Sequence, residues 1–261
     1  MLPVARLVPP AESAAAIPVA GRLTLDAGRL DAALGGGLAL AGSHEIYGPA
    51  SMALALMLML ASPRDGPILW ICSGRRDDGR LNGDGIAELG GDPARLWLVS
   101  AGGVLPMLRA AAEAQRCGAL AGVVLDSGTD APAIDLTVTR RLQLAAAASG
   151  VFTLLLRRGS PRPSAALTRW QAVPAVSRRL AAGAPGSPRL AITLARQRGG
   201  PADIAATLEW NRDRCRFFGA DRGVGAAIPI GAAFGGHAAH FGRVPAVPVG
   251  RASHRAAPRA A

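Results

Sequence analysis

Residues 44–60 of the chain read HEIYGPASMALALMLML, and the surrounding segments can be interpreted outward from them. The stretch begins as a short strand, Glu45-Ile46-Tyr47, turns at Gly48-Pro49 and continues into an apolar helix. Strand, glycine turn and helix in this order are typical of a phosphate-binding P-loop. That motif requires the spacing G-x-x-x-x-G-K-[ST], so its chemistry can be checked position by position from Gly48.

The positions that would bind phosphate carry the wrong side chains. Counted from Gly48, the second glycine is Ala53, the lysine is Leu54 and the hydroxyl residue is Ala55. A change of register cannot restore the motif, because the chain contains no lysine. Two interpretations follow: a P-loop whose nucleotide chemistry has been replaced by hydrophobic packing, or a buried strand-turn-helix that never bound phosphate. The vestigial positions are Gly48, Pro49, Ser51, Ala53, Leu54 and Ala55.

Composition indicates the compartment and the type of core. Half of the 261 residues are hydrophobic but only ten are aromatic, so the core must be rich in Ala, Leu and Val. The longest apolar run, Met52–Ala61, is about half of the roughly 20 residues that span a bilayer. The N-terminus lacks the apolar region of a secretory signal. Cys72, Cys117 and Cys215 form no C-x-x-C pair, which is typical of reduced thiols. We therefore expect a cytoplasmic protein without membrane contact, bound metal or cofactor.

The net charge of +11 is carried by arginine alone on the basic side. A strongly basic balance is typical of proteins that meet acidic partners, such as nucleic acid or an acidic protein face. Arginine replaces lysine throughout, and alanine is abundant, which also indicates a coding bias. Charge by itself therefore does not decide the partner.

Apolar strands and helical segments alternate from residue 44 to residue 156. After the first strand, further strands are expected at 68–72, 96–99, 121–125 and 151–156, with helices over 104–117 and 137–148. This alternation predicts a parallel sheet with helices on both faces. Three strands in a row follow, at 166–176, 190–197 and 204–210, and predict an antiparallel extension of the same sheet. The expected fold class is α/β.

The chain divides into three segments by composition. Residues 1–20 carry four prolines among small residues and are expected to form a flexible lead-in. Residues 21–218 are expected to form a single domain. From residue 219 the chain consists mainly of Gly, Ala, Pro and Arg without hydrophobic periodicity, so 219–261 is predicted to be a disordered tail.

Several motifs recur in a recognisable order. LTLDAGRLDAALGGGLALAGSHEIYGPAS occupies residues 23–51, ILWICSGRRDDG residues 68–79, and AGVVLDS residues 121–127. ALTRWQAVPAV and PRLAITLARQRGGPADIAATLEWN follow, from residues 166 and 188. In this order and spacing they resemble the RecA-like recombinases over about residues 21–211. The degenerate P-loop and the closing LEWNRDRCRFF resemble, within that superfamily, the ImuA family of mutagenesis accessory proteins.

The resemblance implies a fold, a role and partners. The fold would be a RecA-like three-layer αβα domain with a mainly parallel sheet extended by late antiparallel strands. The role would be non-catalytic, in damage-induced (SOS) mutagenesis and translesion DNA synthesis, through protein contacts with an error-prone polymerase assembly. Implied partners are an inactive Y-family polymerase-like protein and an error-prone replicative-type polymerase, with RecA and single-stranded DNA as further candidates. Two alternatives stay open: a SulA-like cell-division inhibitor, and a RecA-like ATPase or DNA-binding protein with a non-standard phosphate site.

Gly74 departs from the pattern of active members of the superfamily, whereas Asp126 retains it. Gly74 stands where those members place the glutamate that activates the attacking water, and Asp77 and Asp78 lie further along the chain. Asp126 ends the strand that resembles Walker B, but without a P-loop it has no magnesium-bound phosphate to serve. It is expected instead to cap the following turn through Ser127 or Gly128. With the lysine, the hydroxyl and the base all missing, we expect no ATP hydrolysis.

Two arginine-rich segments are candidate contact sites. The first could follow a phosphate backbone or be a solvated arginine loop; it comprises Arg157, Arg158, Arg162 and Arg169. The second mixes aromatic and basic side chains as interface anchors do, or docks into the core; it comprises Trp210, Arg212, Arg214, Arg216, Phe217 and Phe218.

Two expectations concern the central stretch itself. Met52–Ala61 is predicted to be a core helix buried on all sides, with Leu54 in the space that a solvated lysine occupies in active relatives. His44 precedes a strand and is expected to be a surface or hydrogen-bonded residue, not a catalytic one.

Overall fold

The computed structural model describes residues 21–74, 81–128, 131–157, 162–184 and 186–219. The strands are β1 (Arg22–Leu23), β2 (Leu38–Ala39), β3 (Ser43–Tyr47), β4 (Ile68–Cys72), β5 (Leu96–Ser100), β6 (Gly122–Asp126), β7 (Phe152–Arg157), β8 (Thr168–Ala175), β9 (Arg189–Gln197), β10 (Ile204–Asn211) and β11 (Arg216–Gly219). The helices are α1 (Gly28–Ala33), α2 (Ser51–Ala61), α3 (Gly83–Glu88), α4 (Val104–Ala114) and α5 (Leu136–Ser149), with short 3-10 turns at Pro93–Arg95 and Ala181–Gly183.

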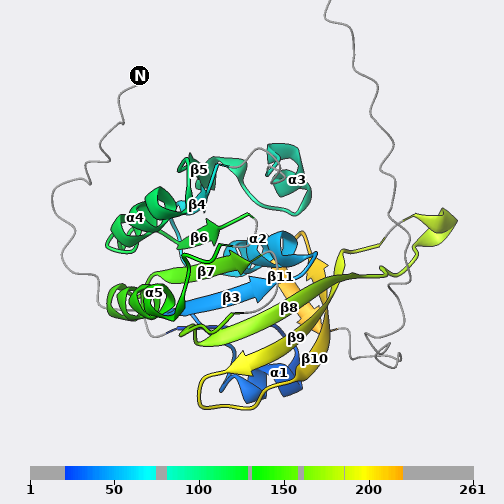
Figure 1. The fold of residues 1–261 in the computed structure, drawn as a ribbon. Helices are drawn as coiled ribbons and strands as arrows, with labels where there is room; N and C mark the ends of the chain where they lie inside the picture. The colour runs from blue at the N-terminus through cyan, green and yellow to red at the C-terminus, as the bar shows by residue number, and fades with distance from the viewer. Residues whose placement is uncertain (1–20, 75–80, 129–130, 158–161, 185, 220–261) are drawn as a thin grey trace, which may run out of the picture. The chain divides into compact units, whose positions relative to one another are not determined.

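One sheet of nine strands organises these elements, in the order β11-β10-β9-β8-β3-β7-β6-β4-β5 (Figure 1). The six strands from β8 to β5 pair in parallel, and β9, β10 and β11 add antiparallel pairs at the other end. The predicted fold class is therefore confirmed. The first of the late strands, β8, lies parallel to β3, so the antiparallel extension begins with β9.

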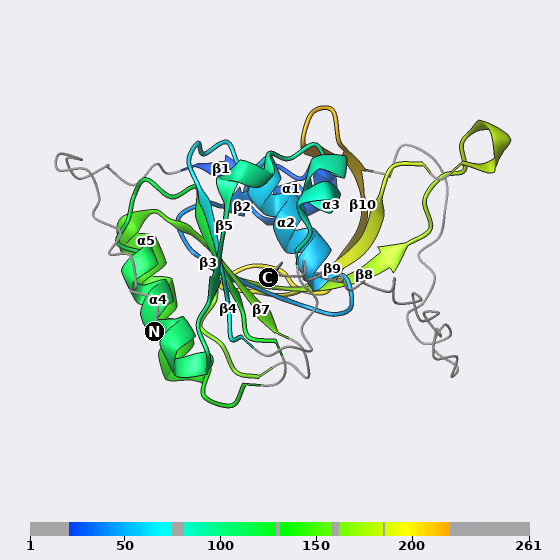
Figure 2. The ribbon, with the colours of Figure 1, turned by 90° about the horizontal axis from the view of Figure 1, so that it is seen from above.

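Helices cover both faces of the sheet and form two cores (Figure 2). On one face α1, α2 and α3 pack against alternate residues of the strands, and this larger core extends from Leu25 to Trp210 and Phe217. On the other face α4 and α5 pack against β4, β6 and β7 through a smaller core that includes Met107 and Leu142. The result is the three-layer arrangement expected from the alternation of strands and helices.

Helix α2 is the centre of the larger core. Its sequence consists almost wholly of Ala, Leu and Met, which are strong helix formers with no polar atoms to satisfy. Each of its residues is buried or half-buried, and Leu54, Ala55 and Met59 are almost completely removed from solvent. The prediction of a core helix at Met52–Ala61 is thus confirmed, and the helix begins one residue earlier.

Three strands were not expected from the sequence. β1 and β2 are two-residue strands that pair with each other, and they are too short to show alternation. β11 follows β10 after a tight turn, and its residues Phe217 and Phe218 pair with Trp210 and Glu209. A four-residue strand of the sequence RFFG gives no periodicity that distinguishes it from a loop.

Within the described ranges, no helix has both the length and the apolar character that crossing a bilayer would need. The predicted lead-in at 1–20 lies outside the described residues, as does the predicted tail except for Gly219.

Candidate functional site

The turn after β3 has the path of a phosphate loop, but two of its backbone amides are already paired. Gly48 has a φ of +100°, and a Cβ there would lie 2.5 Å from the carbonyl oxygen of Ala172 on β8. The next amides turn inward as well: Ala50 N–H donates to the Ala172 carbonyl over 3.1 Å, and Ser51 N–H donates to Gly48 over 3.1 Å. A P-loop works because such amides are free to point at an anion. Here two of them are satisfied by the protein itself.

The side chains that follow the turn complete this closure. Leu54, at the position of the missing lysine, is 1% exposed, and Ala55 is fully buried. Both belong to the larger core. Apolar packing therefore occupies the place from which a lysine and a hydroxyl would reach phosphate in the motif.

The strand-end positions that resemble catalytic ones also have structural roles. Asp126 is 3% exposed, and its Oδ1 accepts a hydrogen bond from Gly128 N–H over 3.0 Å, which confirms the predicted turn cap. Gly74 has a φ of +87°, and a Cβ there would lie 3.0 Å from both the Gly102 nitrogen and the Ser100 hydroxyl. A glutamate at position 74 would be strained and crowded. Asp77 and Asp78 lie outside the described residues.

No group of three or more His, Cys, Asp or Glu side chains suited to a metal ion occurs among the described residues.

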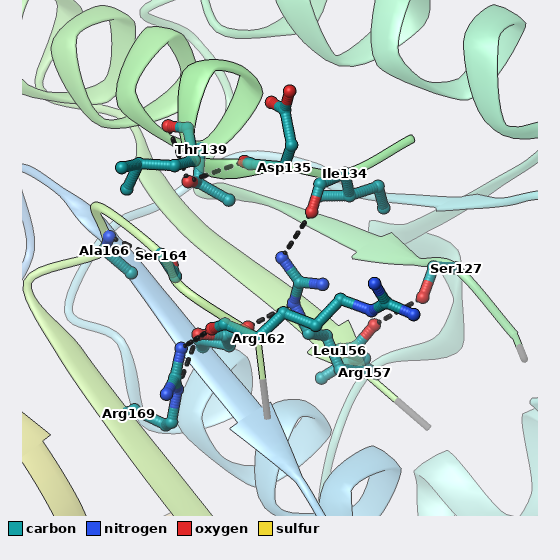
Figure 3. Close-up of polar contacts among 12 residues, drawn as sticks. Ser127, Ile134, Asp135, Thr139, Leu156, Arg157, Arg162, Ser164, Ala166 and Arg169 are labelled. Atoms are coloured by element: carbon teal, nitrogen blue, oxygen red, sulfur yellow. Dashed lines mark hydrogen bonds and ion pairs between the residues drawn. The ribbon is translucent and has the colours of Figure 1, made fainter. Parts of the chain in front are cut away.

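A buried carboxylate on β3 explains two of the four arginines proposed as nucleic-acid contacts. Glu45 is 1% exposed and forms ion pairs with Arg157 on β7 and, over 2.8 Å, with Arg169 on β8. Arg157 also donates to the Ile134 carbonyl over 2.8 Å, and Arg169 donates to the Arg162 carbonyl (Figure 3). Burial lowers the pKa of the Arg157 guanidinium from its ordinary value, and the neighbouring Glu45 opposes that shift.

These contacts correct the predicted role of that segment. Arg157 is 5% exposed and Arg169 is partly buried, so neither is placed to follow a phosphate backbone or to form a solvated loop. Arg158 lies outside the described residues, and Arg162 takes part in the same network through its carbonyl. The sequence does not show this, because the partner, Glu45, is more than a hundred residues away and belongs to a short strand that gives no sign of an ion pair.

Two further arginines fix the same segment from β9 and the residue after it. Arg196 donates to the carbonyls of Ser164 and Ala166 over 2.9 and 2.6 Å, and Arg198 donates to that of Ala165 over 2.8 Å. Residues 164–166, which lead into β8, are therefore held by guanidinium groups rather than by regular strand pairing.

His44, next to Glu45, is buried and fully hydrogen-bonded. Its Nε2 lies 2.8 Å from the Ala39 carbonyl and its Nδ1 lies 2.7 Å from the Thr168 hydroxyl. A carbonyl can only accept, so Nε2 carries the proton and Thr168 donates to Nδ1. Thr168 in turn accepts from the Trp170 indole over 2.6 Å. Burial lowers the pKa of His44 to about 4, so the ring is neutral at physiological pH.

Of the two alternatives for the aromatic residues near the end of the domain, an interface anchor or docking into the core, the structure favours the core for Trp210 and Phe217. Trp210 is 1% exposed, stacks edge-on against Phe217 at 5.0 Å between ring centres, and donates from its indole to the Leu89 carbonyl. Phe217 is 5% exposed and Phe218 is half-buried. Arg212, Arg214 and Arg216 remain exposed. A hollow of about 440 Å³ next to them is lined by Thr24, Asp26, Asn211, Arg214, Arg216, Phe217 and Phe218.

An apolar surface that the sequence did not indicate lies at the open edge of the sheet. Within the described residues β5 is the last strand and pairs only with β4. Its side chains Trp97 and Leu98 are 41% and 58% exposed, and Leu105 at the start of α4 is 61% exposed. The apolar run at 96–99 predicts a strand, and the strand is present, but its position at the edge of the sheet leaves it only half-covered.

Comparison with known proteins identifies the family. No protein-family model matches the chain. Protein ImuA from two strains of Caulobacter vibrioides, NA1000 / CB15N and ATCC 19089 / CIP 103742 / CB 15, is 34% identical over 193 residues, which cover 64% of this chain and 74% of each relative. The chain belongs to the ImuA family. This confirms the resemblance to the ImuA family that the motifs indicate.

Solved structures show the fold of this ImuA-family chain. The RadB recombinase superposes with a TM-score of 0.53 at 17% identity, over 73% of this chain and 97% of the RadB chain. At that identity the likeness shows a shared RecA-like fold and nothing about activity.

Proposed function

We propose that this ImuA-family chain is a non-catalytic, RecA-like accessory protein in damage-induced mutagenesis and translesion DNA synthesis. It acts by protein contacts with an error-prone polymerase assembly, in which an inactive Y-family polymerase-like protein is the direct partner. The observation that carries the non-catalytic role is the closed turn after β3. Its Ala50 amide is bonded to Ala172, and Leu54 is buried where a lysine would act.

Three losses act together at this site. Phosphoryl transfer depends on placed positive charge, a coordinated metal and a positioned water. The lysine and the hydroxyl are replaced by Leu54 and Ala55, and position 74 has little room for a base. Restoring one of these groups leaves the others missing, so a single substitution should not restore ATP hydrolysis.

The test is equilibrium binding of a fluorescent ATP analogue with magnesium, with an active RecA-like recombinase as the positive control. We expect no binding in the micromolar range. A dissociation constant near 1 μM corresponds to about 8 kcal/mol of binding free energy, more than the remaining backbone amides of the turn can supply, and would contradict the proposal. We expect the variant Ala53→Gly/Leu54→Lys/Ala55→Thr to hydrolyse no ATP either, because no base is restored at position 74.

The surface that supports a protein-binding role is the edge strand β5. An open strand edge offers unpaired backbone groups to an added strand, and alternate side chains on it can enter pockets of a partner. Trp97 and Leu98 point to opposite faces of the sheet at this edge, and both are exposed. We propose that an extended apolar segment of the polymerase-like partner pairs with β5.

Pull-down of the purified polymerase-like partner tests this surface. The double variant Trp97→Ser/Leu98→Ser should lose most binding, whereas Leu144→Ser, on α5 and 61% exposed, should retain it. Equal retention by both variants would exclude β5 as the contact and leave the exposed arginines around the 440 Å³ hollow as the next surface to test.

A further inference from the structure

The connection between β8 and β9 forms an arm that extends beyond the sheet (Figures 1 and 2). We call the described residues 176–184 and 186–188 the β8–β9 arm. Its two sides approach closely: a Cβ on Gly186 would collide with the carbonyl of Arg178, and Leu180 N–H donates to the Ala184 carbonyl over 2.8 Å. The described residues of the arm thus form a narrow loop whose two sides lie close together, with a 3-10 turn at Ala181–Gly183.

The side chains on the β8–β9 arm are unusual for a solvent-exposed loop. Val176 is 86% exposed and Leu180 is 59% exposed, although neither has a core within the domain to enter. Arg178 and Arg179 stand between them, and both are exposed. No Asp or Glu occurs anywhere from 176 to 188. The arm therefore presents positive charge together with apolar surface.

Other arginines of the sheet differ from this pair in one respect that matters for binding. Arg157 and Arg169 neutralise Glu45, while Arg196 and Arg198 hold backbone carbonyls. Their guanidinium groups are engaged inside the domain. Arg178 and Arg179 lie on an arm without carboxylates, so an external polyanion is the natural counter-charge.

We propose that the β8–β9 arm binds double-stranded nucleic acid. A narrow projecting arm fits a groove of the duplex, paired arginines contact phosphates on its walls, and apolar side chains on the arm lie against base edges or wedge between them. Arg178 and Arg179 supply the phosphate contacts, and Val176 and Leu180 supply the apolar contact. This surface is additional to the polymerase-binding role proposed above and does not depend on it.

The experiment measures binding of the purified full chain to a labelled 30-base-pair duplex by fluorescence anisotropy over a series of salt concentrations. The arm variant is Arg178→Ser/Arg179→Ser. Its matched control, Arg140→Ser/Arg141→Ser on the exposed face of α5, removes the same charge from another surface. Each phosphate contact contributes about 0.9 to the slope of log affinity against log salt, so the arm variant should lower the slope by about 1.8, and the control should leave it unchanged. Arg178→Lys/Arg179→Lys should keep most of the slope.

The apolar contact has its own readout. Val176→Ser/Leu180→Ser should weaken duplex binding severalfold while leaving the salt slope unchanged, and it should not alter thermal melting, because both side chains are already exposed. The proposal is overturned if the arm and control variants lower the slope equally, or if single-stranded DNA of the same length binds as tightly as duplex through the arm. It is overturned as well if the arm variants lose the polymerase-like partner with duplex binding intact, since the arm would then be a protein contact.

Discussion

The central strand β3 and the edge strand β5 invert the usual pattern of polar outside and apolar inside. β3 lies in the middle of the sheet, and its polar residues Ser43, His44 and Glu45 are all almost completely buried. β5 lies at the open end and carries the sequence LWLVS, with Trp97 and Leu98 exposed. The polar strand is inside and the apolar strand is outside.

β3 and β5 differ in the contacts that their side chains make within the domain. The polar side chains of β3 have partners within the domain: Ser43 pairs with Gln143, His44 with Thr168 and Ala39, and Glu45 with two arginines. Buried polar groups are tolerated when they are paired and costly when they are not. Among the described residues β5 has a partner strand on one side only, and its apolar residues Trp97 and Leu98 remain exposed, which is why we propose this edge as the contact with the polymerase-like partner. The polar residues in the centre of the sheet thus belong to an internal network, whereas the exposed apolar residues at its edge have no covering element among the described residues.

The largest expected effect comes from removing the charge at the centre of β3. Glu45→Gln keeps the shape of the side chain but leaves Arg157 and Arg169 without their carboxylate. Breaking a buried ion pair by removing one partner typically costs about 3–5 kcal/mol, and we expect a loss of that size in the free energy of unfolding, measured by urea denaturation.

The matched control is Glu113→Gln on α4. Glu113 pairs with Arg116 over 3.7 Å with both side chains mostly exposed, so its loss should change stability by less than about 1 kcal/mol. A Glu45 variant as stable as the Glu113 variant would show that the central network does not require its charge.

A charge placed in the apolar helix after β3 should be nearly as damaging. Leu54→Lys buries an ammonium group without a partner, and we expect a loss of about 3 kcal/mol. Ala53→Lys, at the half-buried neighbouring position, should be better tolerated. If thermal melting of the Leu54 variant matched that of the parent protein, the lysine would be reaching solvent and the closed turn would be more open than its contacts indicate.

The neutral state of His44 should make stability depend on pH. The pKa of His44 is lowered to about 4 in the folded protein from 6.5, so the folded state resists the proton that the unfolded chain accepts. Its contribution is fully present above pH 6.5 and is lost as the pH falls toward 4. From pH 6.5 to 4.5 the loss should reach about 2 kcal/mol. His44→Gln removes the titrating ring and should give a shallower pH dependence over this window, whatever its stability at pH 7.

The strands that could be predicted from the sequence are those long enough to show a pattern. β3 to β10 all appear within about two residues of their predicted positions. β4, β6 and β7 were the clearest of these, because buried parallel strands have continuous hydrophobic sequences. β1, β2 and β11 have two to four residues each, so the alternation that defines a strand is absent. Their presence depends on pairing with segments that are already in place, such as Phe217 against Trp210.

The candidate sites were less predictable than the fold. The loss of the phosphate chemistry at positions 53–55 could be read directly, because a motif specifies residue types at fixed spacing. The roles of Arg157 and Arg169 could not, because the sequence does not show that β3 lies between β7 and β8 and so brings Glu45 between them. Exposure at β5 depends on strand order, which is also a property of the assembled sheet.

The smallest effect on stability is expected at the edge strand β5. Trp97→Ser/Leu98→Ser replaces two half-covered side chains, so the free energy of unfolding should fall by no more than about 1 kcal/mol per site, while binding of the polymerase-like partner should fall strongly. The same measurements on Glu45→Gln should give the reverse: a large loss of stability and, at a temperature where the variant remains folded, unchanged partner binding. A double variant at β5 that melts far below the parent protein would mean that Trp97 and Leu98 support the domain itself. β5 would then be an ordinary core strand at the edge of the sheet, with no external role for its apolar residues.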